Sequence, residues 1–127
     1  MSSIRIAVLG SGDATPILDG AAVPVPLQMS GIDTTLLPVP EAPFPLTPDD
    51  RLICEQAYLA AGIEAADAGA DAVYINTVGD YGLSALNQVL SIPVMGAGSG
   101  ALQYALTFAS RFSIVTLWPP AMRFIYD

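Results

Sequence analysis

The segment Asp71–Gly82, with the sequence DAVYINTVGDYG, constrains the fold of this chain more than any other. Its apolar residues 72–75 are followed at once by the small and polar residues 76–80. The same order returns at residues 93–100, PVMGAGSG. Buried strands that end at small polar residues are typical of open parallel sheets, whose carboxyl edge binds ligands. We therefore expect the functional site at these strand ends, with Thr77 as its first candidate.

Composition and charge exclude several classes of function. The 127 residues hold four Arg, no Lys and no His against twelve acidic residues, so the net charge is −8. So few cations cannot neutralise many phosphates, and we expect no nucleic-acid partner. The missing Lys and His remove Schiff-base chemistry, a P-loop lysine, nearly all serine triads and most zinc sites. The single cysteine, Cys54, allows neither an internal disulfide nor a thiolate metal cluster, and we predict a small buried residue.

The chain is 53% hydrophobic, which is enough to bury a core in a domain of this length. Its apolar runs never reach the roughly 18 uninterrupted residues that a membrane helix requires. The first residues, MSSIRI, lack the layout of a signal peptide. We therefore expect a cytoplasmic protein without a membrane partner.

Apolar periodicity and turn residues divide the chain into alternating strands and helices. Strands are expected at residues 3–9, 31–37, 71–76, 92–95 and 111–117. Helices are expected at residues 47–68, 82–90, 99–110 and 121–127, with a short one near residues 16–20. This alternation predicts an α/β fold in three layers, a parallel sheet with helices on both faces.

The longest predicted helix carries its own start and stop signals. Thr47 can cap it, Pro48 suits its first position, and Gly69 can end it. Apolar residues at helical spacing predict its buried face, namely Leu52, Leu59, Ile63 and Ala66. The preceding residues 38–48 are rich in proline, so we expect an extended loop there rather than a helix or a central strand. That loop has two interpretations, a lid over the strand ends or a passive connector.

Three motifs follow one another in the second half of the chain. They are Asp80-Tyr81-Gly82, the strand and loop PVMGAG at residues 93–98, and FSIVT at residues 112–116. In this order and spacing, the motifs resemble those of the aspartate/glutamate/hydantoin racemase superfamily, most closely its hydantoin racemase branch. The resemblance is strong over residues 63–117 and weak over residues 13–48.

The resemblance implies two similar α/β lobes that face each other across a cleft, each supplying one cysteine. One thiolate removes the α-proton of the substrate and the opposite thiol returns a proton, without a cofactor or a metal. On this basis, residues 1–110 are the first lobe. Residues 111–127 are a crossover strand and the start of a helix that belongs to an incomplete second lobe. Thr77 holds the position of the first-lobe cysteine.

Thr77 is the predicted catalytic residue, although its chemistry differs from that of a cysteine. A thiol has a pKa of about 8.5 and can be tuned into a base, whereas an aliphatic hydroxyl stays protonated without a neighbouring base. Thr77 can donate a hydrogen bond to a substrate carboxylate or to a developing enolate oxygen. The alternative is structural, a threonine that ends a strand and caps the following turn.

Further positions are predicted to bind substrate, namely Ser11, Gly12, Asn76, Val78, Gly79, Ser99 and Thr116. Backbone amides in the turn after residue 75 can bind an anion, and glycines after the first strand permit close approach. The resemblance implies that Ser11 binds substrate oxygens and that Thr116 lies in an anion-binding position of the second lobe. Ordinary turns are the alternative for the loop positions. We predict that Asp80 caps the helix beginning near Gly82.

The leading hypothesis is a cofactor-independent, racemase-like enzyme that acts at the α-carbon of a small carboxylate or a hydantoin. The isolated chain is expected to be inactive, because the second cysteine is missing. Two alternatives remain open, a non-catalytic carboxylate-binding protein on the same scaffold and a decarboxylase-like member that works with one cysteine. The apolar residues 122–126 also predict association into a homo-oligomer.

Overall fold

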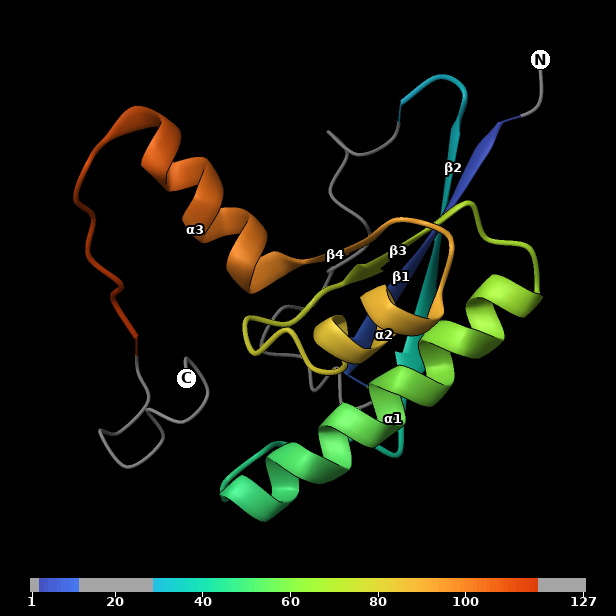
Figure 1. Cartoon of the computed structure of the whole chain (residues 1–127), viewed down its shortest axis with the longest axis horizontal. Helices are drawn as coiled ribbons and strands as arrows, with labels where there is room; N and C mark the ends of the chain where they lie inside the picture. Colours follow the sequence, from blue (N-terminus) through green and yellow to red (C-terminus); the bar gives the residue numbers. More distant parts are fainter. Residues whose placement is uncertain (1–2, 12–28, 117–127) are drawn as a thin grey trace.

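The computed structural model describes residues 3–11 and 29–116 of the chain (Figure 1). Its strands are β1 (Ile4–Ser11), β2 (Ile32–Val39), β3 (Ala72–Ile75) and β4 (Val94–Gly96). Its helices are α1 (Pro48–Asp67), α2 (Leu83–Val89) and α3 (Ala97–Phe108). The helices predicted near residues 16–20 and at residues 121–127 lie outside the described residues.

The four strands form one parallel sheet in the order β2-β1-β3-β4. The register pairs Leu9 of β1 with Ile75 of β3, and Ile75 with Gly96 of β4. The carboxyl ends of these three strands therefore meet at one edge of the sheet, as the sequence predicts. Strand β2 includes Pro38, which is tolerated because β2 lies at the edge of the sheet. The predicted α/β fold with a parallel sheet is confirmed.

Helix α1 begins with the predicted signals. The Thr47 side chain accepts a hydrogen bond from the backbone amide of Asp50, and the Asp50 carboxylate accepts one from the Thr47 amide in return. This reciprocal pair satisfies donors that the first turn of a helix otherwise leaves without a partner. At the other end, Gly69 adopts a φ of +92°, a conformation that glycine accepts without steric cost. The predicted span of residues 47–68 matches α1 closely.

Helix α1 packs through residues other than those predicted. Its buried residues are Cys54, Tyr58, Gly62 and Ala65. By contrast, Leu52 and Ile63 are 59% and 38% exposed, so the predicted face was wrong at these two positions. Leu59, which belongs to the same predicted face, is partly buried against the core. Close approach explains the difference, because Leu86 of α2 fills the space that a side chain at Gly62 would occupy. A small residue lets the two helices touch, and the side chains of Leu52 and Ile63 are left exposed.

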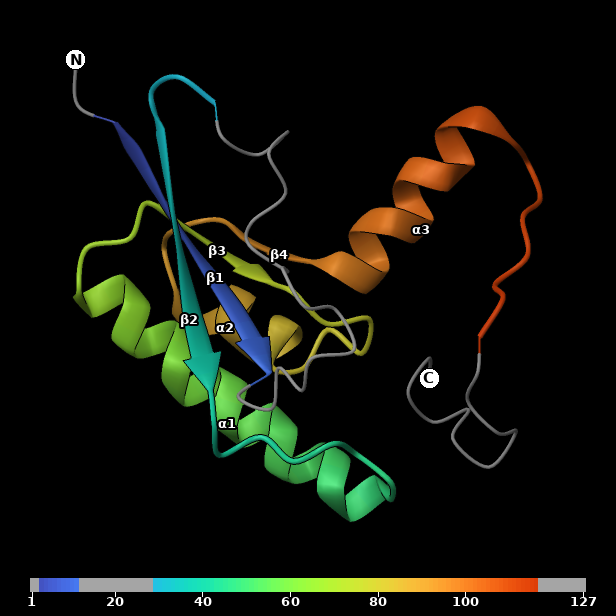
Figure 2. The ribbon, with the colours of Figure 1, turned by 180° about the vertical axis from the view of Figure 1, so that it is seen from behind.

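Helices α1 and α2 lie on the same face of the sheet (Figure 2). Under them lies the core, which includes Leu9, Val73, Ile75, Tyr58 and Leu86. The alternate strand residues lie on the opposite face, where Ile6, Val8, Tyr74 and Met95 help to line a hollow of about 270 Å³. Helix α3 projects beyond β4, away from α1 (Figure 1). None of the described helices is long and apolar enough to cross a membrane.

The prediction of a fifth strand at residues 111–117 is wrong for the described residues 111–116. Residues 111–116 are exposed, and they join no strand ladder in the described part of the chain. A strand needs a neighbour for its backbone hydrogen bonds. Because α3 projects from the sheet, the chain that follows it is carried away from β4 (Figure 1). The sequence pattern alone could not reveal that this partner is missing.

Candidate functional site

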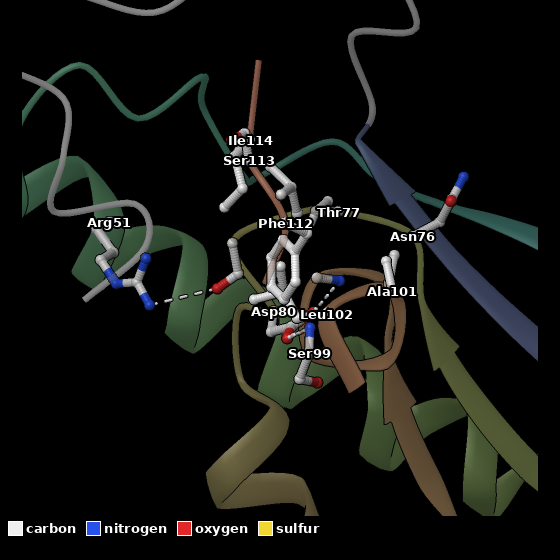
Figure 3. Close-up of a pocket in the computed structure, with 14 residues that line it drawn as sticks. Arg51, Asn76, Thr77, Asp80, Ser99, Ala101, Leu102, Phe112, Ser113 and Ile114 are labelled. Atoms are coloured by element: carbon white, nitrogen blue, oxygen red, sulfur yellow. Dashed lines mark hydrogen bonds between the residues drawn. The ribbon is translucent and has the colours of Figure 1, made fainter. Parts of the chain in front are cut away.

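A pocket of about 700 Å³ lies at the carboxyl edge of the sheet, where the sequence predicts the site (Figure 3). Three stretches of the chain line it: residues 76–80 after β3, residues 97–99 at the start of α3, and residues 112–114 after α3. Arg51, Ala101 and Leu102 complete the lining. The first two stretches meet because the parallel strands β3 and β4 bring their carboxyl ends together.

The loop after β3 is held against the beginning of α1. The Arg51 side chain donates to the Gly79 carbonyl oxygen at 3.3 Å, and its guanidinium carbon lies 5.4 Å from the centre of the Tyr81 ring. One turn later, the Glu55 carboxylate accepts a hydrogen bond from the Gly82 amide. Arg51 and Glu55 also form an ion pair, in which the guanidinium Nη2 lies 3.4 Å from the carboxylate Oε1. These contacts give the loop a defined shape on one side of the pocket.

The Thr77 hydroxyl is buried, and it has no hydrogen-bond partner in the described part of the chain. Thr77 belongs to the lining of the pocket, where it follows Asn76 in the loop after β3. A buried hydroxyl without a partner costs about 1–3 kcal/mol, so most are paired. The capping role considered from sequence would have given this hydroxyl a partner, and the described residues show none.

Asp80 does not use its carboxylate to cap α2, which corrects the prediction. Its two carboxylate oxygens accept hydrogen bonds from the Gly98 amide at 2.8 Å and from the Ser99 amide at 2.6 Å, both in the first turn of α3 (Figure 3). Only the Asp80 backbone oxygen reaches α2, where it accepts from the Leu83 amide. Asp80 also has a φ of +48°, uncommon for a residue other than glycine. The Asp80 carboxylate therefore caps α3, which begins 17 residues further along the chain, and not the adjacent α2.

Most of the predicted binding residues line the pocket, although their roles remain predictions. Val78, Gly79 and Ser99 belong to its wall. Asn76 also borders it, but the side chain points away from the other labelled residues (Figure 3). Backbone and sheet topology explain this grouping, since all four follow β3 or β4.

The remaining three predicted positions have different outcomes. Ser11 ends β1, where it pairs with Val39 of β2, and Gly12 lies outside the described residues. Thr116 is exposed and is not part of the lining, because the strand expected to place it does not form. Two lining residues that sequence reasoning missed are Arg51 and Phe112. No sequence pattern around Arg51 indicates a role in the site, because α1 contacts the loop after β3 only through tertiary packing.

Cys54 is buried in the core, as predicted, and lies outside the pocket lining. Its thiol is 3.0 Å from the Pro43 carbonyl oxygen, to which it donates. Burial raises the pKa of the Cys54 thiol, and the nearby Asp50 carboxylate raises it further. The thiol is therefore protonated at neutral pH and a poor nucleophile. In the described residues, no group of three or more His, Cys, Asp or Glu is placed to hold a metal ion.

Comparisons with known proteins agree with this architecture. A family model described as "Asp/Glu/Hydantoin racemase" matches residues 35–125, well over half of the chain. A hydantoin racemase of Rhizobium meliloti is 39% identical over 59 residues, which cover 46% of this chain and 24% of that protein. An allantoin racemase structure from Klebsiella pneumoniae matches with a TM-score of 0.70 and 25% identity.

The structural match extends over 97% of this chain and 51% of the allantoin racemase chain. The chain thus spans about half the length of that relative and about a quarter of the hydantoin racemase. The four-stranded parallel sheet and three helices of the described residues correspond to one lobe of a racemase chain. From the family match and the shared fold, we conclude that this chain belongs to the Asp/Glu/hydantoin racemase family.

Proposed function

We propose that this chain is the first lobe of a cofactor-independent, racemase-like enzyme and that its pocket binds a small carboxylate or a hydantoin. The observation that carries the proposal is the Thr77 hydroxyl, which is buried at the pocket wall without a partner in the described residues. A bound ligand oxygen would accept its hydrogen bond and remove the cost of leaving it unpaired. The names of the two relatives, hydantoin racemase and allantoin racemase, support small substrates of that kind.

In this proposal, Thr77 stabilises charge rather than moving a proton from carbon. When the α-proton leaves the substrate, negative charge develops on the adjacent carbonyl or carboxylate oxygen. A hydrogen bond from Thr77 to that oxygen lowers the barrier most where the surroundings exclude water. The backbone amides of Val78 and Gly79, which belong to the same loop, are further donors toward the same oxygen.

The proton acceptor comes from outside the described lobe. An aliphatic hydroxyl is too weak an acid to lose its proton at neutral pH, so Thr77 cannot serve as the base. Cys54 cannot serve either, because it is buried and lies outside the pocket lining. A cysteine of a second lobe, facing Thr77 across the pocket, would supply the base. Residues 112–114 already contribute to the pocket wall, which supports their assignment to a boundary between lobes near residue 110. The chain alone would then bind a substrate without turning it over.

The proposal is tested by the substitution Thr77→Val, which removes the hydroxyl and keeps the shape of the side chain. We expect weaker binding of hydantoin or a small carboxylate, by about fivefold to tenfold in titration calorimetry, together with about 1 kcal/mol greater stability. Both effects follow from removing a buried donor that only the ligand satisfies. The matched control is Thr35→Val, on an exposed position of β2, which should leave binding unchanged.

A second measurement separates binding from catalysis. The complete natural protein that contains this lobe is incubated in deuterium oxide with amino acids, hydantoins and arylmalonates. Exchange of the α-hydrogen, reduced by Thr77→Val, supports the enzyme. If Thr77→Val and Thr35→Val bind all these ligands equally, the proposed role of Thr77 is wrong.

A non-catalytic binding protein is the second candidate function. It is favoured by the threonine at the position where the family resemblance implies a cysteine, and by the burial of Cys54. This candidate gives the same binding result for Thr77→Val. It differs in showing no α-hydrogen exchange in the complete protein, which decides between the two.

A further inference from the structure

We infer that Asp80 determines the charge selectivity of the pocket, by occupying the place where a second negative group of a ligand would bind. This inference rests on the proposed function, since it assumes that the pocket takes a substrate. It assigns the pocket to molecules that are uncharged or carry a single negative charge. Molecules with two negative groups are excluded by a carboxylate that belongs to the protein itself.

The first observation is the pair of contacts at the start of α3. The Asp80 carboxylate accepts hydrogen bonds from the Gly98 amide at 2.8 Å and the Ser99 amide at 2.6 Å. All three residues belong to the pocket lining. The first amides of a helix attract anions, because they lack helical partners and carry the positive end of the helix dipole. In this protein an internal carboxylate satisfies them, so they cannot serve a ligand at the same time.

The second observation is that the surrounding chain is shaped around this carboxylate. A side chain at Gly96 would collide with the Asp80 carboxylate, and one at Gly98 would collide with the Val78 carbonyl oxygen. Asp80 itself holds a left-handed backbone conformation, with a φ of +48°. Such a conformation is retained when the surrounding contacts enforce it. The arrangement therefore places the charge at the pocket wall in a defined position.

The third observation is the balance of charge in the pocket. Among the lining residues, Arg51 and Asp80 are the charged side chains. Arg51 contacts the Gly79 carbonyl oxygen, the Glu55 carboxylate and the Tyr81 ring. A ligand with two carboxylates would bring its second charge beside Asp80, where like charges repel. The Thr77 hydroxyl and the nearby amides can serve one anionic group, which leaves the second without compensation.

The experiment uses inorganic sulfate, a dianion that requires no catalysis for its detection. In Asp80→Gly the carboxylate is removed, and glycine accepts the left-handed conformation. We expect sulfate to bind this variant about tenfold more tightly than the unchanged chain in titration calorimetry. The control is Asp67→Asn, which changes the net charge by the same amount at an exposed position near the end of α1. It should bind sulfate as weakly as the unchanged chain.

A measurement on the unchanged chain keeps the inference testable even if Asp80→Gly fails to fold. Sulfate should not shift the NMR resonances of the Gly98 and Ser99 amides, because Asp80 already occupies them. A shift of those resonances in the unchanged chain would overturn the inference. So would a folded Asp80→Gly variant that binds sulfate no better than Asp67→Asn.

These outcomes are distinct from those that test the proposed function. A protein without α-hydrogen exchange whose Asp80→Gly variant gains sulfate binding would refute the enzyme and keep the role of Asp80. An active enzyme whose variant gains nothing would keep the enzyme and refute the role of Asp80.

Discussion

Helices α1 and α3 are both rich in apolar residues, yet they hold very different positions in this molecule. Helix α1 buries four residues and starts with a capping box made from its own sequence. Helix α3 buries only Gly98, and the amides of Gly98 and Ser99 in its first turn are satisfied by Asp80, from the loop after β3. Apolar composition therefore predicts helix formation, but it does not reveal how much stability a helix gains from burial.

The largest contrast is expected from truncating one tyrosine on each helix. Tyr58 on α1 is 1% exposed, and Tyr104 on α3 is 67% exposed. Tyr58→Ala should lower the free energy of unfolding by about 3–5 kcal/mol, because it leaves a cavity in the core. Tyr104→Ala should cost about 0.5 kcal/mol, mainly by losing the edge-on contact with Phe108. Urea denaturation followed by circular dichroism measures both values.

Equal losses in the two variants would contradict this contrast. That result would mean that α3 packs as tightly in solution as α1, for instance against another part of the assembly. The predicted homo-oligomer could provide such packing, and sedimentation of the unchanged chain would test for it.

A second contrast concerns the pH dependence of stability. Burial raises the pKa of Tyr81, whose ring contacts Tyr58 and Arg51, from the ordinary value of 10.0 to about 12. The folded state then holds the phenol proton more tightly than the unfolded state. The free energy of unfolding should therefore fall as the pH rises from about 10 to about 12, by at most about 3 kcal/mol.

The substitution Tyr81→Phe should make this part of the pH profile less steep, as measured by urea denaturation at several pH values. A part of the slope should remain, because burial also raises the pKa values of Tyr58 and Cys54. Tyr104→Phe is the matched control, because it removes the same hydroxyl from an exposed ring on α3. A profile that keeps its slope in Tyr81→Phe would show that other groups cause the alkaline loss.

The smallest expected contrast between the two helices concerns how their first turns are capped. Thr47→Ala removes the local cap of α1 and should lower the free energy of unfolding of the whole domain by about 1 kcal/mol. Amide hydrogen exchange should then accelerate throughout α1 and the sheet. The amides of α3 should respond little, because they open locally with a lower free energy than the core. Uniform acceleration that includes α3 would contradict this separation.

Local signals predicted most of the fold. The capping residues Thr47 and Pro48 and the stop at Gly69 located α1 closely, and the runs before Asn76 and Gly96 located β3 and β4. The buried face of α1 was missed, because the contact of Gly62 with Leu86 depends on how two helices approach. The strand expected at residues 111–117 was a wrong prediction for the described residues 111–116, since a strand forms only where another strand can pair with it.

The candidate site shows the same division. The loop containing Thr77 and the helix start containing Ser99 were both predicted from strands that end in small polar residues. The contribution of Arg51 was not predicted, because 25 residues separate it from Asn76 and only packing brings α1 to the loop. The bond between Asp80 and α3 was missed for a similar reason, since the adjacent α2 offered a nearer helix to cap.

The sequence by itself determined the alternation of strands and helices, the edge of the sheet at which a ligand can bind, and the hydroxyl at position 77. These follow from periodicity, turn residues and the parallel topology, all of which act over short stretches of chain. The tertiary structure alone decided which side chains meet in the pocket, that Thr77 is buried without a partner in the described residues, and that Asp80 serves α3. Such contacts depend on how whole elements pack in space, and short-range sequence patterns do not contain that information.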